Sequence, residues 1–290
     1  MINKKTADIA MIITAIIWGT GFIGTEIAIE AGAKTSLIVA MRFVFAGIIL
    51  LCVNFKDVKT IQKSTFKIGV IAGVMLFLGF YFQASGQAMT TVSNSSFLTA
   101  TNVVIVPFLV WAVTKKPPSF KYFVLAFTTL IGASILTMDT TVGISFNQGD
   151  FLVLCSAFCF AIHIVHLSIF AKDLNSKQMT FLQMMTIGVV GTAYILIFER
   201  SAIDFEIIKQ IFLPTMYLAT FCSCVCYYLQ TTAQKFTTAS KAGLFLGLEG
   251  LFGSVFSVML GMDKLTTNLF LGGTIIIASV ILSEINFSKK

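Results

Sequence analysis

Charged residues are scarce in this chain. Only 11% of the 290 residues are Asp, Glu, Lys or Arg, while 57% are hydrophobic. In soluble proteins roughly a quarter of the sequence is charged, so a soluble domain of this length could not hide so much apolar surface. Apolar runs of about twenty residues, the length that spans the hydrocarbon core of a bilayer, recur along the whole chain. The composition therefore indicates a polytopic membrane protein whose main partner is the lipid bilayer.

The motifs of several other protein classes are missing. The chain has no Gly-rich phosphate loop, which excludes ATP as an energy source within it, and no H-E-x-x-H pattern of a zinc hydrolase. The net charge is +7, but the Lys residues stand singly or in pairs between apolar runs, without the basic stripe of a nucleic-acid-binding surface. We therefore predict neither nucleic acid nor a cofactor as a partner.

The six cysteines all lie within apolar runs, which argues against a disulfide framework. Cys222, Cys224 and Cys226 are spaced by two, so on a helix they point in different directions. We interpret them as small packing residues and predict no metal site.

A repeated stretch of thirteen residues is the most informative feature. Residues 81–93 align with residues 228–240 at a constant offset of 147, with six identities, and two Gln residues stand four apart in each copy, on one helix face. The first helix of each half also aligns, at an offset of 142, with Asp8 matching Asp150 and Trp18 matching Phe160. We interpret this pattern as an internal duplication around one shared site.

The apolar pattern predicts ten helices, over residues 7–29, 35–54, 67–88, 91–113, 119–138, 150–171, 177–198, 211–235, 238–260 and 267–285. With the amino terminus in the cytoplasm, fourteen Lys residues fall on the cytoplasmic side and four Lys or Arg residues on the other, so both termini are predicted to be cytoplasmic.

An odd number of helices per half requires the second half to insert from the opposite side. We therefore predict an all-α membrane protein with ten transmembrane helices as two inverted five-helix repeats, residues 1–143 and 144–290. Transporters use this plan, with substrate bound near the midplane between the repeats.

The chain also resembles a known family through motifs in both halves: Trp18-Gly19, Arg42, residues 90–94 leading into 103–107, Gly149-Asp150, Gln234, Leu248-Glu249 and residues 263–266. In their order and spacing these resemble the drug/metabolite transporter superfamily, in its bacterial ten-helix members with two EamA-like repeats. It departs from them in having Leu248-Glu249-Gly250 where relatives often have Leu-Glu-Pro. The resemblance implies a secondary carrier in a bacterial-type inner membrane, often an exporter of amino acids, metabolites or cationic toxicants.

Glu249 is the first candidate for function. A carboxylate in the middle of a membrane helix costs on the order of 3 kcal/mol to insert, so it faces a cavity or a partner. It is either a proton-coupling group or a fixed brace between two helices.

Two basic groups extend the set of coupling candidates. Arg42 lies inside the second predicted helix and either attracts an anionic substrate group or pairs with Glu26 or Glu30 near the membrane surface. His163 shares a polar face with Ser156, Cys159 and His166, and either relays protons or makes structural hydrogen bonds.

The predicted substrate-binding residues are polar or aromatic side chains within apolar segments: Trp18, Gln83, Thr99, Asn102, His163, Tyr228, Gln230 and Glu249. Trp18 and Tyr228 could stack on an apolar substrate, or pack against a neighbouring helix. The amides and hydroxyls could line a pathway, or form interhelical hydrogen bonds of about 0.6 kcal/mol each.

Together these features predict a secondary active transporter, an exporter of small metabolites such as amino acids or organic cations, working by alternating access and driven by an ion or proton gradient. Two alternatives stay open: an intramembrane enzyme acting on a lipid or peptide through His163, His166 and Glu249, and a non-transporting membrane sensor. No oligomeric state is predicted.

Overall fold

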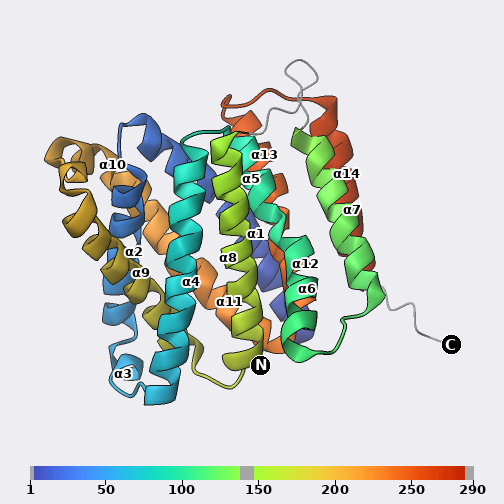
Figure 1. Ribbon diagram of the computed structural model, residues 1–290, viewed down its shortest axis with the longest axis horizontal. Coiled ribbons are helices and arrows are strands. Elements are labelled where there is room, and N and C mark those ends of the chain that lie inside the picture. Colours follow the sequence, from blue (N-terminus) through green and yellow to red (C-terminus); the bar gives the residue numbers. More distant parts are fainter. Residues whose placement is uncertain (1–2, 138–146, 285–290) are drawn as a thin grey trace.

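The computed structural model describes residues 3–137 and 147–284, and the regular structure within them is entirely helical (Figure 1). The elements are α1 (Lys4–Glu30), α2 (Thr35–Val53), α3 (Phe55–Val58), α4 (Lys63–Gln87), α5 (Val92–Ala100), α6 (Asn102–Thr114), α7 (Phe120–Thr137), α8 (Gln148–Phe170), α9 (Ser176–Phe198), η1 (Arg200–Ala202), α10 (Phe205–Tyr217), η2 (Leu218–Val225), α11 (Cys226–Ala233), η3 (Gln234–Phe236), α12 (Ala239–Leu246), α13 (Leu248–Met259) and α14 (Thr267–Glu284).

Among the described residues, eight helical segments are long and apolar enough to cross a membrane: Lys4–Glu30, Thr35–Val53, Lys63–Gln87, Val92–Thr114, Gln148–Phe170, Ser176–Phe198, Phe205–Phe236 and Ala239–Met259. Two shorter apolar stretches, Phe120–Gly132 and Phe270–Leu282, lie where the fifth and tenth helices were predicted. The prediction of an all-helical, multi-pass membrane protein is therefore confirmed.

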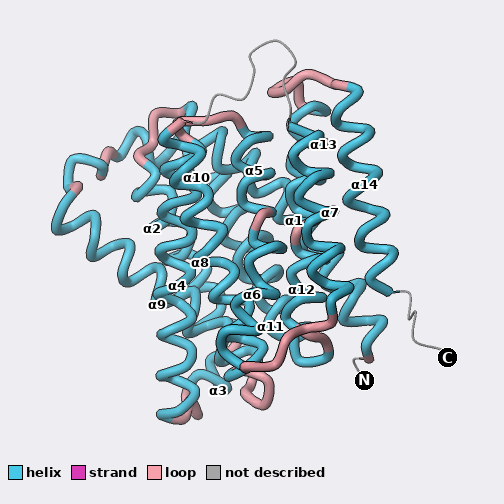
Figure 2. Tube along the Cα trace, turned by 45° about the vertical axis from the view of Figure 1, so that its right-hand side comes forward, coloured by secondary structure: helices cyan, strands magenta, loops and turns pink. Residues whose placement is uncertain are grey.

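The helices pack around α1, which contacts α5, α11, α12 and α13. On one side α4 packs along α8 and α9, while α2 packs along α9. Figures 1 and 2 show α7 and α14 side by side at the edge of the bundle, in contact with each other. The shared interior is therefore built by α1, α4, α8 and the broken helices described next.

Two predicted helices are broken near their middle. The predicted helix 91–113 divides into α5 and α6 at Thr101, and 238–260 divides into α12 and α13 at Gly247. Each break contains a tight bond from residue i to residue i−3, because Thr101 N donates to Leu98 O and Gly250 N donates to Gly247 O. The breaks lie 146 residues apart, at matching places in the duplication.

The predicted helix 211–235 is longer and less regular than expected. Its first element, α10, begins at Phe205, because the Asp204 side chain caps it by accepting from the backbone N–H of Glu206 at 2.8 Å. The segment then widens into the π-helix η2 before α11. Such wide turns are rare and frequently occur at functional sites.

Outside the membrane-spanning segments, Asp57 on the short helix α3 ties the loop after α2 to the start of α9. Lys177 Nζ lies 3.2 Å from one Asp57 oxygen, and Asn175 Nδ2 donates to the other at 3.0 Å. These bonds hold the pKa of the Asp57 carboxyl below its ordinary value. The contact fixes the end of α2 relative to α9.

Close contact between α1 and α13 depends on Gly19. A Cβ atom at this position would lie 2.7 Å from Phe252 Cβ and 2.8 Å from the backbone nitrogen of Gly253. Since backbone atoms cannot move aside as a flexible side chain can, a larger residue must push the two helices apart. Gly19 therefore lets the halves of the chain approach each other beside Trp18.

We expect Gly19→Ala to destabilise the protein by about 1–3 kcal/mol through overpacking. Gly243→Ala is the matched control, because its added Cβ would meet Val106 at 3.5 Å, an ordinary contact. Both changes gain the same helix propensity, so the difference between their thermal unfolding curves in detergent isolates the clash. Equal stability of the two variants would contradict this packing.

Candidate functional site

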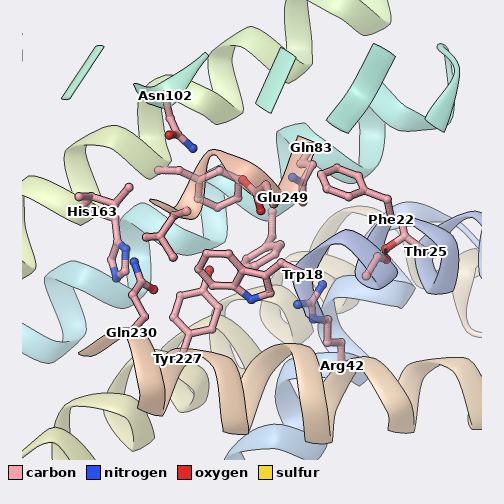
Figure 3. Close-up of a pocket in the computed structure, with 15 residues that line it drawn as sticks. Trp18, Phe22, Thr25, Arg42, Gln83, Asn102, His163, Tyr227, Gln230 and Glu249 are labelled. Carbon is pink, nitrogen blue, oxygen red and sulfur yellow. Dashed lines mark hydrogen bonds between the residues drawn. The ribbon is translucent and has the colours of Figure 1, made fainter. Parts of the chain in front are cut away.

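A small cavity lies where α1, α2, α4, α6, α8, α11, α12 and α13 meet (Figure 3). The cavity has a volume of about 40 Å³, which is enough to hold water molecules. Its lining residues come from both halves of the chain: Trp18, Gly21, Phe22, Thr25, Arg42, Phe80, Gln83, Asn102, Phe160, His163, Ile164, Tyr227, Gln230, Leu246 and Glu249. The cavity is thus surrounded by side chains that are far apart in sequence.

Most of the lining residues are related by the duplication. Twelve of the fifteen form six pairs at the offsets of 142 and 147: Trp18 with Phe160, Gly21 with His163, Phe22 with Ile164, Phe80 with Tyr227, Gln83 with Gln230, and Asn102 with Glu249. Asn102 and Glu249 each directly follow a helix break, in the first turn of α6 and of α13. Equivalent positions of the two halves therefore face one common space.

Arg42 brings the cavity its basic group. The side chain is 95% buried, and its Nε donates to Ser223 Oγ at 2.8 Å. The guanidinium carbon lies 4.5 Å from the centre of the Phe80 ring and 5.0 Å from that of Phe43. Of the two partners considered for Arg42 from the sequence, Glu26 instead accepts from Gln87 Nε2 at 2.9 Å.

Glu249 is the acidic group of the cavity and is 94% buried. Within residues 3–137 and 147–284 its carboxylate has neither a hydrogen bond nor an ion pair. A fixed brace would require such a bond, so the described contacts leave the carboxylate available to a ligand or a proton.

The two histidines have different surroundings. His163 lines the cavity, and its Nε2 donates to Gln183 Oε1 at 2.6 Å, with the imidazole 5.9 Å from the Tyr227 ring. His166 donates to the backbone carbonyl of Ile68 at 3.1 Å and does not line the cavity. His166 therefore links α8 to α4, and only His163 is placed to meet a ligand.

Trp18 is held by the π-helix. Its indole Nε1 donates to the carbonyl of Cys222 at 2.8 Å, and its ring lies 5.2 Å from that of Tyr227. The π-helix thus fixes both Trp18 and Arg42, through the neighbouring residues Cys222 and Ser223. Sequence reasoning treated Cys222 as a packing residue and did not consider Ser223, since a single π-turn leaves no periodic signal over so short a stretch.

Two of the predicted substrate-binding residues do not line the cavity. Tyr228 is 38% exposed on the outside of the bundle, whereas Tyr227 is buried and lines it. Residues three apart share a helix face and residues two apart do not. Because Gln230 lines the cavity, Tyr227 lies on the same helix face and Tyr228 does not. Thr99 is buried behind the lining, where it accepts from Gln83 Nε2 at 3.1 Å.

The arrangement combines the basic side chain of Arg42 and the acidic side chain of Glu249 with amides and five aromatic rings. Such a mostly apolar space with a few convergent polar groups is typical of a small-molecule site. No group of three or more metal-ligating side chains occurs in the described part of the chain.

We expect Tyr227→Ala to destabilise the protein by about 2–4 kcal/mol, because it empties space between Trp18, Phe80 and His163. The neighbouring Tyr228→Ala is the control and should cost less than about 0.5 kcal/mol, since that ring is partly exposed. Thermal unfolding in detergent measures both. A larger loss for Tyr228→Ala would contradict the placement of the two rings.

Comparison with known proteins identifies the family of this chain. The chain is 28% identical over 281 residues to an uncharacterized transporter of Archaeoglobus fulgidus, covering 97% of this chain and 86% of that protein. A crystal structure with 13% sequence identity superimposes with a TM-score of 0.79, over 97% of this chain and 96% of the other, which shows a shared fold. The profile of the EamA-like transporter family matches residues 5–138 and 147–285. The resemblance inferred from the sequence is thereby confirmed, and the chain belongs to the EamA-like transporter family.

Proposed function

We propose that this protein is a secondary active transporter of small metabolites, such as amino acids or organic cations, that works by alternating access. The observation that carries the proposal is the cavity lined by equivalent residues of both halves. Its free volume of about 40 Å³ is too small for a metabolite, so binding requires the two halves to move apart. Export is the proposed direction, by resemblance to the family.

The proposed architecture has ten transmembrane helices in two inverted repeats, residues 1–143 and 144–290. Several observations support opposite insertion. In Figure 1, α1 begins at the lower end of the molecule, where the N-terminus is marked, whereas α8 begins at the upper end. Likewise α4 rises from α3, while the chain descends from α10 to α11. With the observed Lys distribution, both termini lie on the cytoplasmic side of a bacterial-type inner membrane.

Duplicated hydrogen bonds also support two equivalent halves. Gln87 Nε2 donates to the carbonyl of Phe22 at 2.9 Å, and Gln234 Nε2 donates to that of Ile164 at 3.1 Å. The donors are 147 residues apart and the acceptors 142 apart. The first bond ties the end of α4 to α1, and the second ties η3 to α8, so each bond joins two segments of one repeat. Each repeat can therefore move as a body against the other.

Contacts at the two ends of the bundle would then act as latches. At the start of α8, Thr90 Oγ1 donates to Asp150 at 2.7 Å. At the start of α1 the equivalent carboxylate, Asp8, pairs with Lys241 at 3.0 Å. There the other Asp8 oxygen and the equivalent hydroxyl of Thr237 have no hydrogen-bond partner among the described residues. The latch at the start of α8 is therefore the more completely bonded one.

We assign coupling to Glu249, which takes up and releases a proton as the cavity changes sides, with an ion or proton gradient as the energy source and no cofactor. Its neutral form is the cheaper one to bury when no ligand cation is present. An intramembrane enzyme would need His163, His166 and Glu249 to converge, and the placement of His166 away from the cavity favours the transporter.

We expect the purified protein in liposomes to accumulate a member of a panel of amino acids and organic cations when a pH gradient is imposed. Glu249→Gln should abolish the response to the gradient, because the amide can neither take up nor release a proton. Uptake of radiolabelled compounds measures both.

Empty liposomes and the Tyr228→Ala variant serve as controls for leakage and for handling of the protein. A Glu249→Gln variant with the pH dependence of the native protein would remove this carboxylate from coupling. Absence of gradient-driven uptake for the whole panel would contradict the transporter proposal itself.

We expect weakening of the two latches to shift the balance between the states open at either end of the bundle in opposite directions. Asp8→Asn removes the ion pair at the start of α1, and Thr90→Val removes the hydroxyl donor at the start of α8 without changing its shape. Each loss of about 1 kcal/mol shifts the balance of states roughly fivefold. Hydrogen exchange should then rise at the weakened end and fall at the opposite end. Both variants loosening the same end would contradict the latch assignment.

A further inference from the structure

The terminal nitrogens of Arg42 are the strongest unexplained feature of the cavity. Its Nε donates to Ser223 Oγ, but its two Nη atoms have no hydrogen-bond acceptor among the described residues. The described ion pairs are Lys177 with Asp57, Lys209 with Glu206 and Lys241 with Asp8, and none includes Arg42. A guanidinium that is 95% buried thus lacks a counter-ion from this part of the chain.

A buried charge without a partner is costly, and arginine cannot lose its proton to escape that cost. Glu249 lines the same cavity but forms no ion pair with Arg42 among the described residues, so the Nη atoms can bind an anion from outside the chain. A guanidinium offers parallel N–H groups in a fixed fork, which match the two oxygens of a carboxylate.

The surroundings hold this fork in one orientation. Ser223 fixes the Nε edge, while the Phe80 and Phe43 rings lie against the guanidinium. Ser223 in turn belongs to the π-helix η2. Since Ser223 touches Arg42 and does not itself line the cavity, it is a positioning residue.

The carboxylate of Glu249 limits the net charge that a bound ligand can carry. Glu249 lines the same space from α13, and the two charges sum to zero (Figure 3). A phosphate with its two negative charges would leave the site negative, whereas a carboxylate together with an ammonium group complements both side chains. The aromatic walls formed by Trp18, Phe22, Phe160 and Tyr227 suit an apolar or aromatic substituent between them.

We propose that the Nη atoms of Arg42, oriented by Ser223, form a carboxylate-binding subsite, so that the substrate is a zwitterion with a carboxylate at Arg42 and an ammonium group at Glu249. This inference rests on the proposed function and chooses amino acids over organic cations within it. The carboxylate accepts two hydrogen bonds from the guanidinium, and no covalent step is involved.

The test compares phenylalanine and leucine with their carboxamides, which keep the ammonium group and the side chain but lose the carboxylate. Binding to the full protein in detergent is measured by calorimetry, and uptake is measured in liposomes. We expect the acids to bind roughly ten- to hundredfold more tightly than their amides, as a charge-assisted bidentate pair predicts. Arg42→Gln should abolish this preference, because the glutamine amide cannot form the charge-assisted pair.

Ser223→Ala should raise KM for the acids several-fold, with little change in their kcat or in amide binding. Ser223→Thr, which keeps the hydroxyl, should restore the native KM. This pair of variants keeps the proposal falsifiable if Arg42→Gln fails to fold, because each retains the guanidinium. A merely structural serine would instead affect acids and amides equally.

Two results separate this inference from the proposed function. Gradient-driven uptake of the amides or of organic cations in preference to the acids would overturn the carboxylate subsite and leave the transporter intact. Binding of the acids that depends on Arg42, without uptake of any compound, would support the subsite and refute the transporter. Failure of the acids to bind would overturn the inference.

Discussion

The high cost of a charge in hydrocarbon is the constraint on which this structure depends. Arg42 and Glu249 lie in apolar helices, where each is tolerated only if it faces protein, water or a ligand. Both face one small cavity at the centre of the bundle. Their burial explains why the helices that carry polar residues, α1, α4, α8 and the broken helices, form the interior while α7 and α14 pack at the edge.

Duplication supplied the framework of that cavity, and divergence supplied its charge. Gln83 and Gln230 keep the same residue type at equivalent positions, as do their hydrogen-bonding neighbours Gln87 and Gln234. In contrast, the residue types differ at two other pairs of equivalent positions: Asn102 corresponds to Glu249, and Gly21 corresponds to His163. The result is a site that is lined by equivalent positions of both halves but has two chemically different sides, which can orient a polar ligand along one direction.

Irregular backbone is concentrated around this site. The breaks at Thr101 and Gly247 precede Asn102 and Glu249, and the π-helix supplies the Cys222 carbonyl and the Ser223 hydroxyl that hold Trp18 and Arg42. Within a membrane, backbone groups released from a regular helix need other partners or a polar cavity. Here the polar side chains at the centre supply hydrogen-bond partners for the irregular turns, and these turns hold Trp18 and Arg42 in place.

Hydropathy over twenty residues and a repeat at fixed offset are local or periodic signals, so the amino-acid sequence alone predicts the membrane class, the apolar helical segments and the duplication. It also identified most of the polar residues that line the cavity, since polar groups in apolar runs must face inward. Three features could not be predicted in this way: Tyr227 rather than Tyr228 lines the cavity, His166 bonds to Ile68, and Arg42 is held by Ser223. These outcomes depend on the rotation of each helix and on a π-turn, which follow from packing between segments that are distant in the chain.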